Sequence, residues 1–434
     1  MTVTSSNHKT LPPDRFSPGY RRYALGVLLV VYTFNFIDRQ ILAILAEPIK
    51  QDLGLSDTQL GFLTGFAFAL FYATLGIPIA RFADRSSRVN IISIALSVWS
   101  LMTALSGLAA NFWQLAVARI GVGVGEAGCS PPAHSLISDF FSREERATAM
   151  AIYTTGVPLG TMFGFLAGGW INEFFGWRIA FFVVGVPGLL LALFVRFALR
   201  EPPRGGMEKD NRPVVEAPPL GEVVRYLWAQ KSFRHISLAA SFAAFAGYGF
   251  VVWLPSFFIR YHGLGTGEIG TWLALLAGIA SGLGTLAGGR LADYFAIRDT
   301  RAYVWIGGIT LLASVPFFVA AFLVSSPGAA ILLLILPYFL NSFWVGPSFS
   351  MVQSLVPPQM RAVASSVFLF WINLIGLGLG PQLIGIASDL LRPSVGDDSL
   401  RYALIASVFV YLWACWHFAR AGRTLAADLK LAER

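Results

Sequence analysis

The chain has 434 residues, of which 56% are hydrophobic and only 13% are charged, whereas soluble domains carry about 25% charged residues. A soluble protein of this length would need several polar-coated domains, and this sequence has too little charge to coat them. Apolar segments of about 20 residues, the length that crosses a bilayer as a helix, recur from residue 22 to residue 420. The composition therefore excludes secreted, cytosolic and disordered proteins and indicates an all-α polytopic membrane protein.

The N-terminal part begins with a polar, proline-containing tail, residues 1–21, which we expect to be cytoplasmic. The apolar stretch that follows is too long for a cleaved signal peptide. Six apolar segments then predict an N-terminal six-helix bundle over residues 22–199, with spans at 22–48, 58–83, 89–110, 112–138, 146–172 and 178–199.

A linker rich in prolines and charges follows at residues 200–233. Near its end, Leu220, Val223, Val224 and Leu227 fall at helical spacing beside Arg225, which predicts an amphipathic helix at the membrane surface. A second bundle of six helices is expected over residues 234–420, before a tail at 421–434. Its predicted spans are 234–259, 268–292, 302–325, 328–355, 362–391 and 401–420.

The basic residues predict the topology. Of the 32 Lys and Arg, Arg39 and Arg119 lie inside predicted spans and 25 fall on one side of the membrane. By the positive-inside rule that side is the cytoplasm, so both termini and the linker are expected there and the protein in the cell (inner) membrane. The net charge of +8 is then explained by topology, and a nucleic-acid partner is excluded. The five that fall on the other side are Lys50, Arg178, Arg260, Arg392 and Arg401.

Motifs of enzyme and metal chemistry are absent from the sequence. Cys129 and Cys415 are isolated in apolar segments and offer neither a disulfide framework nor a metal pair. No P-loop, HExxH or GxSxG motif occurs, so an ATP-driven pump and a serine hydrolase are not supported. We expect no enzymatic activity, no metal and no cofactor.

The two predicted bundles are internal repeats. Arg146-Ala-Thr-Ala opens the fifth span and Arg361-Ala-Val-Ala opens the eleventh, 215 positions later, while Asp84 and Asp293 are 209 positions apart. Duplicated halves that enclose a site near the bilayer midplane are typical of secondary transporters.

The loop between the second and third spans, Ala80-Arg-Phe-Ala-Asp84-Arg85-Ser-Ser-Arg88, resembles the signature loop of the major facilitator superfamily. The resemblance implies that Asp84, Arg85 and Arg88, with Asp293 from the second repeat, form a cytoplasmic gate. In the fourth span, Leu115-x3-Arg119-x2-Val122-Gly123-x-Gly125 resembles the helix that this superfamily associates with proton coupling. The implied fold is the major facilitator fold, with twelve transmembrane helices in two pseudo-symmetric six-helix bundles.

A narrower resemblance lies in Asn35-Phe-Ile-Asp38-Arg39 together with Gly123-Val-Gly125-Glu126-Ala-Gly128. These segments are similar to the Spinster family of lipid and lysolipid carriers. The resemblance implies translocation of lysophospholipids or sphingoid phosphates, driven in some members by protons.

The charged residues inside the spans also point to a coupling site on physical grounds. An ionised side chain at the bilayer centre costs about 2.5–3.5 kcal/mol on insertion scales, so it needs a partner. Asp38 and Arg119 are predicted at matching depth and are expected to meet, with Glu126 deeper on the same face as Arg119. We expect Asp38, Arg119 and Glu126 to form a proton switch in which Asp38 is the decisive acid, unless these residues form only a static structural ion pair. A secondary polar track would contain Asn35, Arg39 and His134.

The second bundle has almost no charge in its spans and offers aromatic and amide side chains instead. Facing a charged wall, these groups would suit an amphiphile with a polar head and a chain. We therefore expect the protein to be a monomeric, proton-coupled carrier of an amphipathic lipid. The surrounding membrane lipids would be its other partners. A drug or metabolite efflux carrier and an energy-independent lipid scramblase are the alternatives. The predicted cavity residues are Tyr248, Trp253, Asn341, Trp344 and Asn373.

Overall fold

The computed structural model describes residues 16–83, 85–204 and 218–432. Every regular element in these ranges is a helix. The first half contains α1 (Pro18–Leu53), α2 (Asp57–Gly61), a π-helical turn η1 (Phe62–Phe66), α3 (Ala67–Ala83), α4 (Arg88–Ser106), α5 (Phe112–Glu126), α6 (Ser130–Phe140), α7 (Arg143–Thr154), α8 (Gly156–Phe175) and α9 (Trp177–Ala198).

The second half begins with the short helix α10 (Leu220–Ala229). It continues with α11 (Lys231–His262), α12 (Thr266–Leu273), η2 (Ala274–Ala280), α13 (Ser281–Ala296), α14 (Ala302–Leu323), α15 (Pro327–Leu340), α16 (Val345–Ser354), η3 (Pro358–Met360), α17 (Arg361–Trp371), η4 (Ile372–Leu379), α18 (Gly380–Val395), η5 (Gly396–Asp398), α19 (Ser399–Val408) and α20 (Val410–Ala432).

These helices cross the molecule twelve times. By length and hydropathy, ten segments of the described chain qualify to span a membrane. The last segment, residues 361–432, contains two membrane-crossing helical rods, because the chain reverses at Gly396. The φ angle of Gly396 is 61°, a left-handed conformation that glycine adopts without strain. One further rod is α5 with α6, which the hydropathy criterion misses because the helix is broken after Glu126. The predicted all-α, twelve-helix fold is therefore confirmed.

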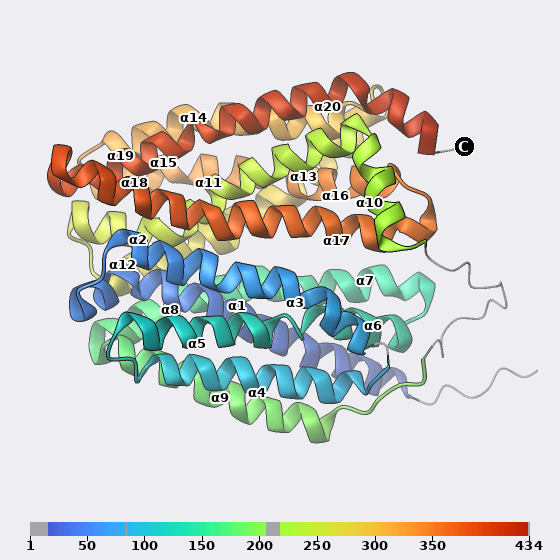
Figure 1. Cartoon of the computed structure of the whole chain (residues 1–434), viewed down its shortest axis with the longest axis horizontal. Coiled ribbons are helices and arrows are strands. Elements are labelled where there is room, and N and C mark those ends of the chain that lie inside the picture. Colours follow the sequence, from blue (N-terminus) through green and yellow to red (C-terminus); the bar gives the residue numbers. More distant parts are fainter. Residues whose placement is uncertain (1–15, 84, 205–217, 433–434) are drawn as a thin grey trace, which may run out of the picture.

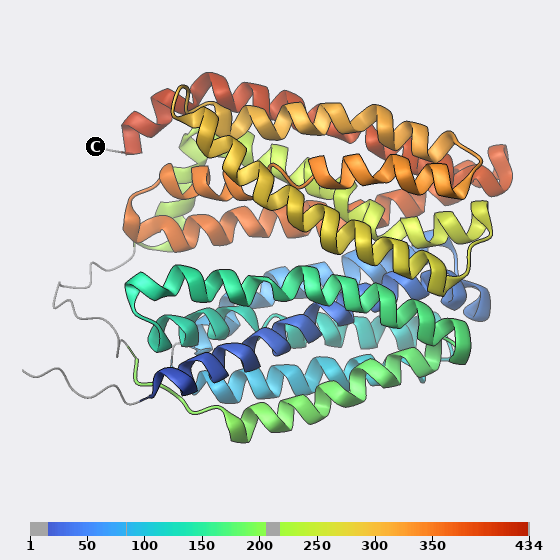
Figure 2. The same cartoon turned by 180° about the vertical axis from the view of Figure 1, so that it is seen from behind.

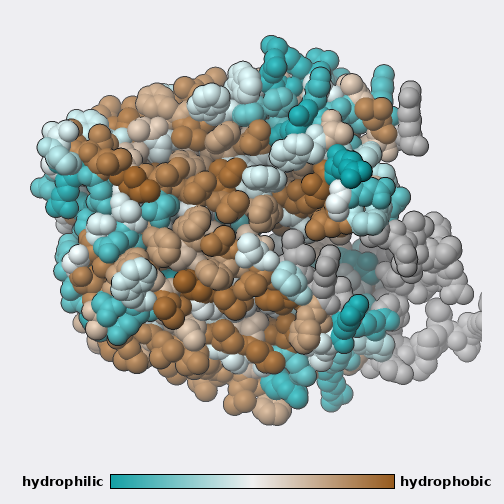
Figure 3. All heavy atoms as spheres, viewed as in Figure 1, coloured by the Kyte–Doolittle hydropathy of each residue, from teal (hydrophilic) through white to brown (hydrophobic). Residues whose placement is uncertain are grey.

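The rods form two stacked bundles whose long axes run in the same direction (Figures 1 and 2). We call the end where α1 begins and α20 finishes the terminal end, and the opposite end, with α2 and α12, the distal end (Figure 1). On the face shown in Figure 3, apolar side chains cover most of the middle, and hydrophilic side chains gather toward the two ends. This distribution fits a protein whose middle faces hydrocarbon.

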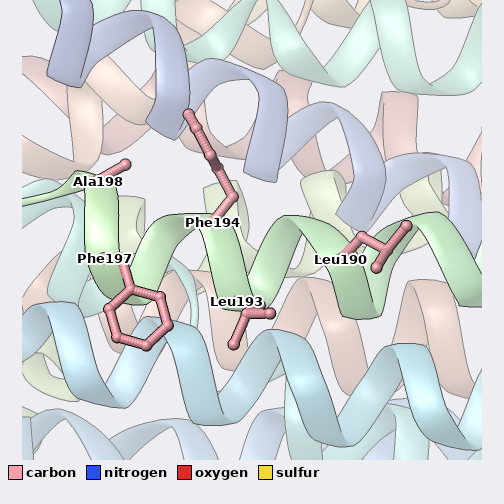
Figure 4. A pocket seen from close by; sticks show the side chains of 5 residues that line it. All are labelled: Leu190, Leu193, Phe194, Phe197 and Ala198. Carbon is pink, nitrogen blue, oxygen red and sulfur yellow. The ribbon is translucent and has the colours of Figure 1, made fainter.

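A shallow groove on the outer face of α9 illustrates the lipid-facing surface. It is lined by Leu190, Leu193, Phe194, Phe197 and Ala198, with no polar side chain among them (Figure 4). A groove so apolar and so open suits an acyl chain of the bilayer and offers nothing to orient a transported substrate.

Small residues allow α8 to pack closely against α1. A Cβ atom at Gly160 would lie 2.4 Å from the Thr33 carbonyl oxygen, and one at Gly164 would lie 2.8 Å from the Gln40 Cβ. Both distances are too short for real atoms, so a larger residue would force the helices apart. These glycines therefore let α8 pack directly against the segment of α1 that carries Asp38.

The helix α10 has two distinct faces. Val223 and Leu227 are buried against the second half, while Leu220, Val224 and Trp228 are exposed. Gln230, just after the helix, donates a hydrogen bond from Nε2 to the Leu355 carbonyl oxygen at 2.8 Å. The helix is therefore anchored to the second half and presents an apolar stripe outward, as expected of an interfacial helix.

The predicted topology is open to a labelling experiment. In a variant without native cysteines, single cysteines at Thr10, Asp210 and Lys430 should react with a membrane-impermeant maleimide only after the cytoplasmic face is exposed. Labelling of any of the three in intact cells would overturn the orientation. A cysteine at Asp397, at the distal end, is the matched control and should react in intact cells.

Candidate functional site

The charged side chains inside the first half come from α1 and α5. Arg39 donates from Nε to Glu126 Oε2 at 2.6 Å, so the two helices are joined by a charge-assisted hydrogen bond. Glu126 is fully buried and the Arg39 side chain is 12% exposed. The bond therefore lies within the protein, at the edge of a partly open space.

Aromatic rings surround the Arg39 guanidinium. Its Cζ lies 4.5 Å from the ring centroid of Tyr72, 4.8 Å from that of Phe36 and 5.0 Å from that of Phe68. Such contacts stabilise a cation that has lost most of its water. Gly123 allows this arrangement, because a Cβ there would lie 2.8 Å from the Phe68 carbonyl oxygen. Gly123 of the fourth-span motif thus makes room for the backbone of Phe68, whose ring lies against the arginine.

The expected pairing of Asp38 with Arg119 differs from what the structure shows. Asp38 is fully buried, and neither carboxylate oxygen has a hydrogen-bond partner; no ion pair joins it to a described residue. Arg119 is also buried, and its Nε and Nη1 atoms have no partner. Neighbouring residues on a helix point about 100° apart, so Arg39 faces Glu126 while Asp38 faces α4. The cation that pairs with Glu126 is therefore Arg39, which sequence analysis had assigned a secondary role.

The remaining members of the predicted polar track lie at different distances from this cluster. Asn35 is fully buried near Glu126, with both amide atoms unpaired. His134 is exposed and packs edge-on against Tyr153, with ring centroids 5.5 Å apart. Asn35 thus belongs to the cluster, whereas His134 is exposed and packs against Tyr153.

A central cavity of about 290 Å³ lies between the halves. Four of the predicted residues line it, namely Tyr248, Asn341, Trp344 and Asn373. Trp253 does not line it and is a correction to the prediction: it is buried nearer the distal end, where its Nε1 donates to the Pro381 carbonyl oxygen at 2.9 Å. No lining residue of this cavity carries a charge.

Sequence analysis missed the contribution of the first half to this cavity. Phe36, Gln40, Val157 and Thr161 line it opposite the second half. Phe36 and Gln40 are four residues apart and flank Arg39, so helical spacing places them on one face. The cavity and the charge cluster therefore meet along α1, with Phe36 touching both.

Ion pairs join the halves at the distal end. Arg260 of α11 bonds to Glu47 at 2.6 Å and to both carboxylate oxygens of Asp57 at 2.7 and 2.8 Å. Lys50 also bonds to Asp57, at 2.5 Å, and Ser388 of the second half donates to the same carboxylate at 2.6 Å. Asp57 is thus held by groups from both halves.

Two further carboxylates at this end cap helices of the opposite half. Asp389 accepts hydrogen bonds from the backbone N–H groups of Asp57 and Thr58, at 3.2 and 2.7 Å, at the start of α2. Glu173 accepts from the Thr266 hydroxyl at 3.0 Å and the Gly267 N–H at 3.2 Å, at the start of α12. These acids are 216 positions apart, close to the repeat interval, so the duplicated halves cap one another reciprocally. A carboxylate at a helix N-terminus satisfies free N–H groups and the helix dipole.

The predicted gate at the terminal end is not engaged across the halves in the described residues. Asp84 lies outside them, and Arg85 is exposed. Arg88 is buried and bonds to Asp139 and, at 2.7 Å, to Glu201, while Asp293 accepts from Tyr303 at 2.8 Å. Each of these bonds stays within one half.

Glu201 links the start of the linker to the first half. Burial acts to raise the pKa of its carboxyl, but hydrogen bonds from the Val89 N–H, Arg88 and Ser87 outweigh burial and lower the pKa below its usual value. The contribution of this group to stability is therefore present above its usual pKa and is lost as the pH falls through the lowered value.

The hydrogen bonds and ion pairs that we find between the halves, within the described ranges, all lie at the distal end. The molecule is therefore closed distally and joined less firmly at the terminal end. A single closed end over a central cavity is one of the states of an alternating-access carrier.

Comparison with known proteins agrees with this geometry. Residues 28–381 match the Major Facilitator Superfamily, so the chain belongs to that family of membrane transporters. A solved structure of a bacterial homolog to the human lysosomal transporter Spinster, inward-facing and unoccupied, superposes with a TM-score of 0.89 at 34% identity, over 95% of this chain and 99% of that one. The human protein spinster homolog 1 is 27% identical over 425 residues, 91% of this chain and 79% of that protein. The similarity to Spinster proteins is confirmed.

The chain is also similar to a transporter that is named as an efflux pump. An MFS-type efflux pump of Mycolicibacterium smegmatis is 36% identical over 399 residues, which is 91% of each chain. The shared features of these relatives therefore define a transporter, and they do not define one substrate.

The reciprocal caps lead to a prediction about the distal end. Glu173→Ala and Asp389→Ala should each increase the distally open population, because each removes a charge-assisted cap worth about 1–2 kcal/mol. The double variant should shift further, since the two caps share no partner. Spin-label distances between the distal ends of the two halves measure the populations.

Asp397→Ala is the control for these variants, because Asp397 is an exposed acid at the same end that caps no helix. An unchanged distance distribution in the double variant, or an equal change in the control, would contradict the role of the caps.

Proposed function

We propose that this protein is a proton-coupled secondary transporter that moves an amphipathic lipid, of the lysophospholipid or sphingoid-phosphate class, by alternating access. The membrane fold and the family support transport. Proton coupling and the substrate class are proposed from the charge cluster and the cavity, and each is argued separately below.

The observation that carries proton coupling is the contrast between two buried acids 88 residues apart in the chain. Glu126 has a cation at 2.6 Å, whereas Asp38 has no hydrogen bond and no ion pair among the described residues. An ionised carboxylate buried without a partner is costly, so a neutral, protonated Asp38 fits this conformation. Glu126 fits the ionised form because Arg39 compensates its charge.

Loss of the proton from Asp38 would change the balance of charge in the cluster. The ionised carboxylate would attract Arg119, whose Nε and Nη1 atoms are unpaired in this conformation. Since Asp38 is on α1 and Arg119 on α5, the attraction would move these helices relative to one another. We infer that this movement is how proton release favours the other access state.

The cavity supports an amphiphilic substrate. Its second-half wall is aromatic and aliphatic, with the amides of Asn341 and Asn373 as polar groups. Arg39 lies next to the wall at Phe36, with its Cζ 4.8 Å from that ring centroid. An anionic head could approach Arg39 in competition with Glu126, while the chain packs against the aromatic wall. At 290 Å³ the cavity is near the lower end of ligand sites, about 300–1,000 Å³, so a long chain would extend toward the terminal end.

Efflux of a drug or metabolite is the second candidate, supported by the similarity to the mycobacterial efflux pump and by the uncharged cavity. An energy-independent scramblase would transport lipid without needing Asp38 or Glu126 to titrate.

We also propose that the protein lies in the cell membrane with both termini in the cytoplasm. The opening at the terminal end then faces the cytoplasm. We propose further that the carrier is monomeric and uses no metal or cofactor.

The coupling proposal predicts that Asp38→Asn fixes the protonated state. The variant should bind substrate while its conformational equilibrium no longer responds to pH, as measured by spin-label distances between the halves. Glu126→Gln should weaken the pH response, because it removes the buried acid that holds Arg39 in the cluster. Arg119→Ala should abolish transport, because it removes the cation that the ionised Asp38 would attract.

Ser100→Ala is the matched control, because it removes a buried hydroxyl from the same half without touching the cluster. Folded Asp38→Asn protein that switches with pH as the parent does would refute the coupling. A static ion pair instead predicts lower stability in all variants and a normal pH response in those that fold.

The substrate proposal predicts co-purification. Native mass spectrometry of the protein should show single-chain lipid bound at one copy, and Asn373→Leu with Trp344→Ala should reduce its occupancy. Liposomes with a proton gradient should accumulate a labelled lysophospholipid faster than liposomes without one. Equal rates with and without the gradient would support the scramblase, and bound drug-like metabolite without lipid would support efflux.

A further inference from the structure

The charged groups that face Asp38, namely Arg119 and Glu126, both come from α5, but two polar groups from α4 face it as well. Trp99 and Thr103 are four residues apart on α4, so they lie on one face of that helix. Both are fully buried. The Trp99 indole Nε1 and the Thr103 hydroxyl have no hydrogen-bond partner, and both approach the Asp38 carboxylate without completing a bond.

Packing fixes the position of Trp99. A Cβ atom at Gly125 would lie 2.7 Å from the Trp99 backbone nitrogen and 2.9 Å from its Cβ. Only glycine therefore lets α4 come this close to α5, at the residue next to Glu126. The aromatic ring is held beside the charge cluster by the backbone on which it sits, and not by a bond of its own N–H.

Leaving donors unpaired inside a protein is unfavourable, and most native buried donors have an acceptor. Here two such donors lie on one helix face, next to a carboxyl group that is itself unpaired. This arrangement suggests that the hydrogen bonds form when the carboxyl group is ionised. A neutral carboxyl needs these donors little, whereas an ionised carboxylate accepts them strongly.

We propose that Trp99 and Thr103 are positioning residues of the proton switch, which donate hydrogen bonds to the Asp38 carboxylate when it has released its proton. They compensate its charge from α4, while Arg119 compensates it from α5. The pH at which the carrier changes state is thereby set by these two neutral side chains. This inference rests on the proposed role of Asp38.

The other helices packed against α1 offer no competing charge at this depth. Among the described residues, α8, α9 and α11 carry charged side chains only near their ends. The helix α7 carries them only in its first turn, and α6 carries Asp139 one residue before its last and the titratable His134. The charges in question are Glu173 on α8, Arg178 and Arg196 on α9, and Lys231, Arg234 and Arg260 on α11, with His235 and His262 as further titratable groups.

The test uses Trp99→Phe, which keeps an aromatic ring, and Thr103→Val, which keeps the shape of the side chain. Each removes one donor. The conformational equilibrium is followed by spin-label distances over a pH series in the full-length protein. The midpoint should move to higher pH by about one unit in each variant, a tenfold change in proton concentration, since each donor stabilises the ionised carboxylate and not the neutral one.

Controls separate this role from a structural one. Ser100→Ala removes a neighbouring buried hydroxyl that lies against Gly188 of α9, and it should leave the midpoint unchanged. Thr103→Ser restores a hydroxyl and should restore the parent midpoint. In an Asp38→Asn background neither donor variant should have any further effect.

An unshifted midpoint in both folded donor variants would overturn the inference, as would an equal shift in Ser100→Ala. These results differ from failure of the proposed function, in which the parent shows no pH midpoint or Asp38→Asn retains it. If Trp99→Phe does not fold, Thr103→Val and its serine rescue decide the question alone.

Discussion

Charge buried away from water has to be compensated, and this constraint organises the first half of the protein. Arg39 and Glu126 satisfy it together, through one hydrogen bond and a surround of aromatic rings. Asp38 and Arg119 do not satisfy it in the observed conformation. A change in protonation of Asp38 or in the relative position of the helices would relieve this uncompensated charge. The residues of the second half that line the cavity carry no charge.

The glycines of the first half support the same arrangement. Gly123 admits the Phe68 backbone, Gly125 admits Trp99, and Gly160 brings α8 against α1. In each contact the glycine lies directly against the backbone of the neighbouring helix. The charged side chains are therefore positioned by closely packed helices rather than by flexible loops. At the distal end the halves are held differently, by carboxylates of one half on helix starts of the other, and this polar interface can dissociate as a unit. Charged side chains held on rigid helices and a separable interface between the halves suit a carrier that works by alternating access.

Much of this could be predicted from the sequence. The twelve helices followed from the recurring apolar segments of membrane-crossing length, and the residues of the charge cluster from the cost of charge in lipid. The partner of Glu126 did not follow, because depth along a helix can be counted whereas rotation depends on packing, and Arg39 and Asp38 are neighbours in the chain. Trp253 was placed wrongly for the same reason. The sequence does not show whether an aromatic residue in a span faces a cavity or a neighbouring helix. Glu173 and Asp389 were missed because each completes its role only on the opposite half.

The central proposal is that proton binding and release at Asp38 are coupled to substrate transport. The most direct measurement is the pH change inside sealed liposomes, followed with a trapped dye, when lysophospholipid is added to reconstituted parent protein and to Asp38→Asn. The account predicts a substrate-dependent proton flux in the parent and none in Asp38→Asn, although that variant still binds the lipid. A proton flux of equal size in both proteins would contradict it.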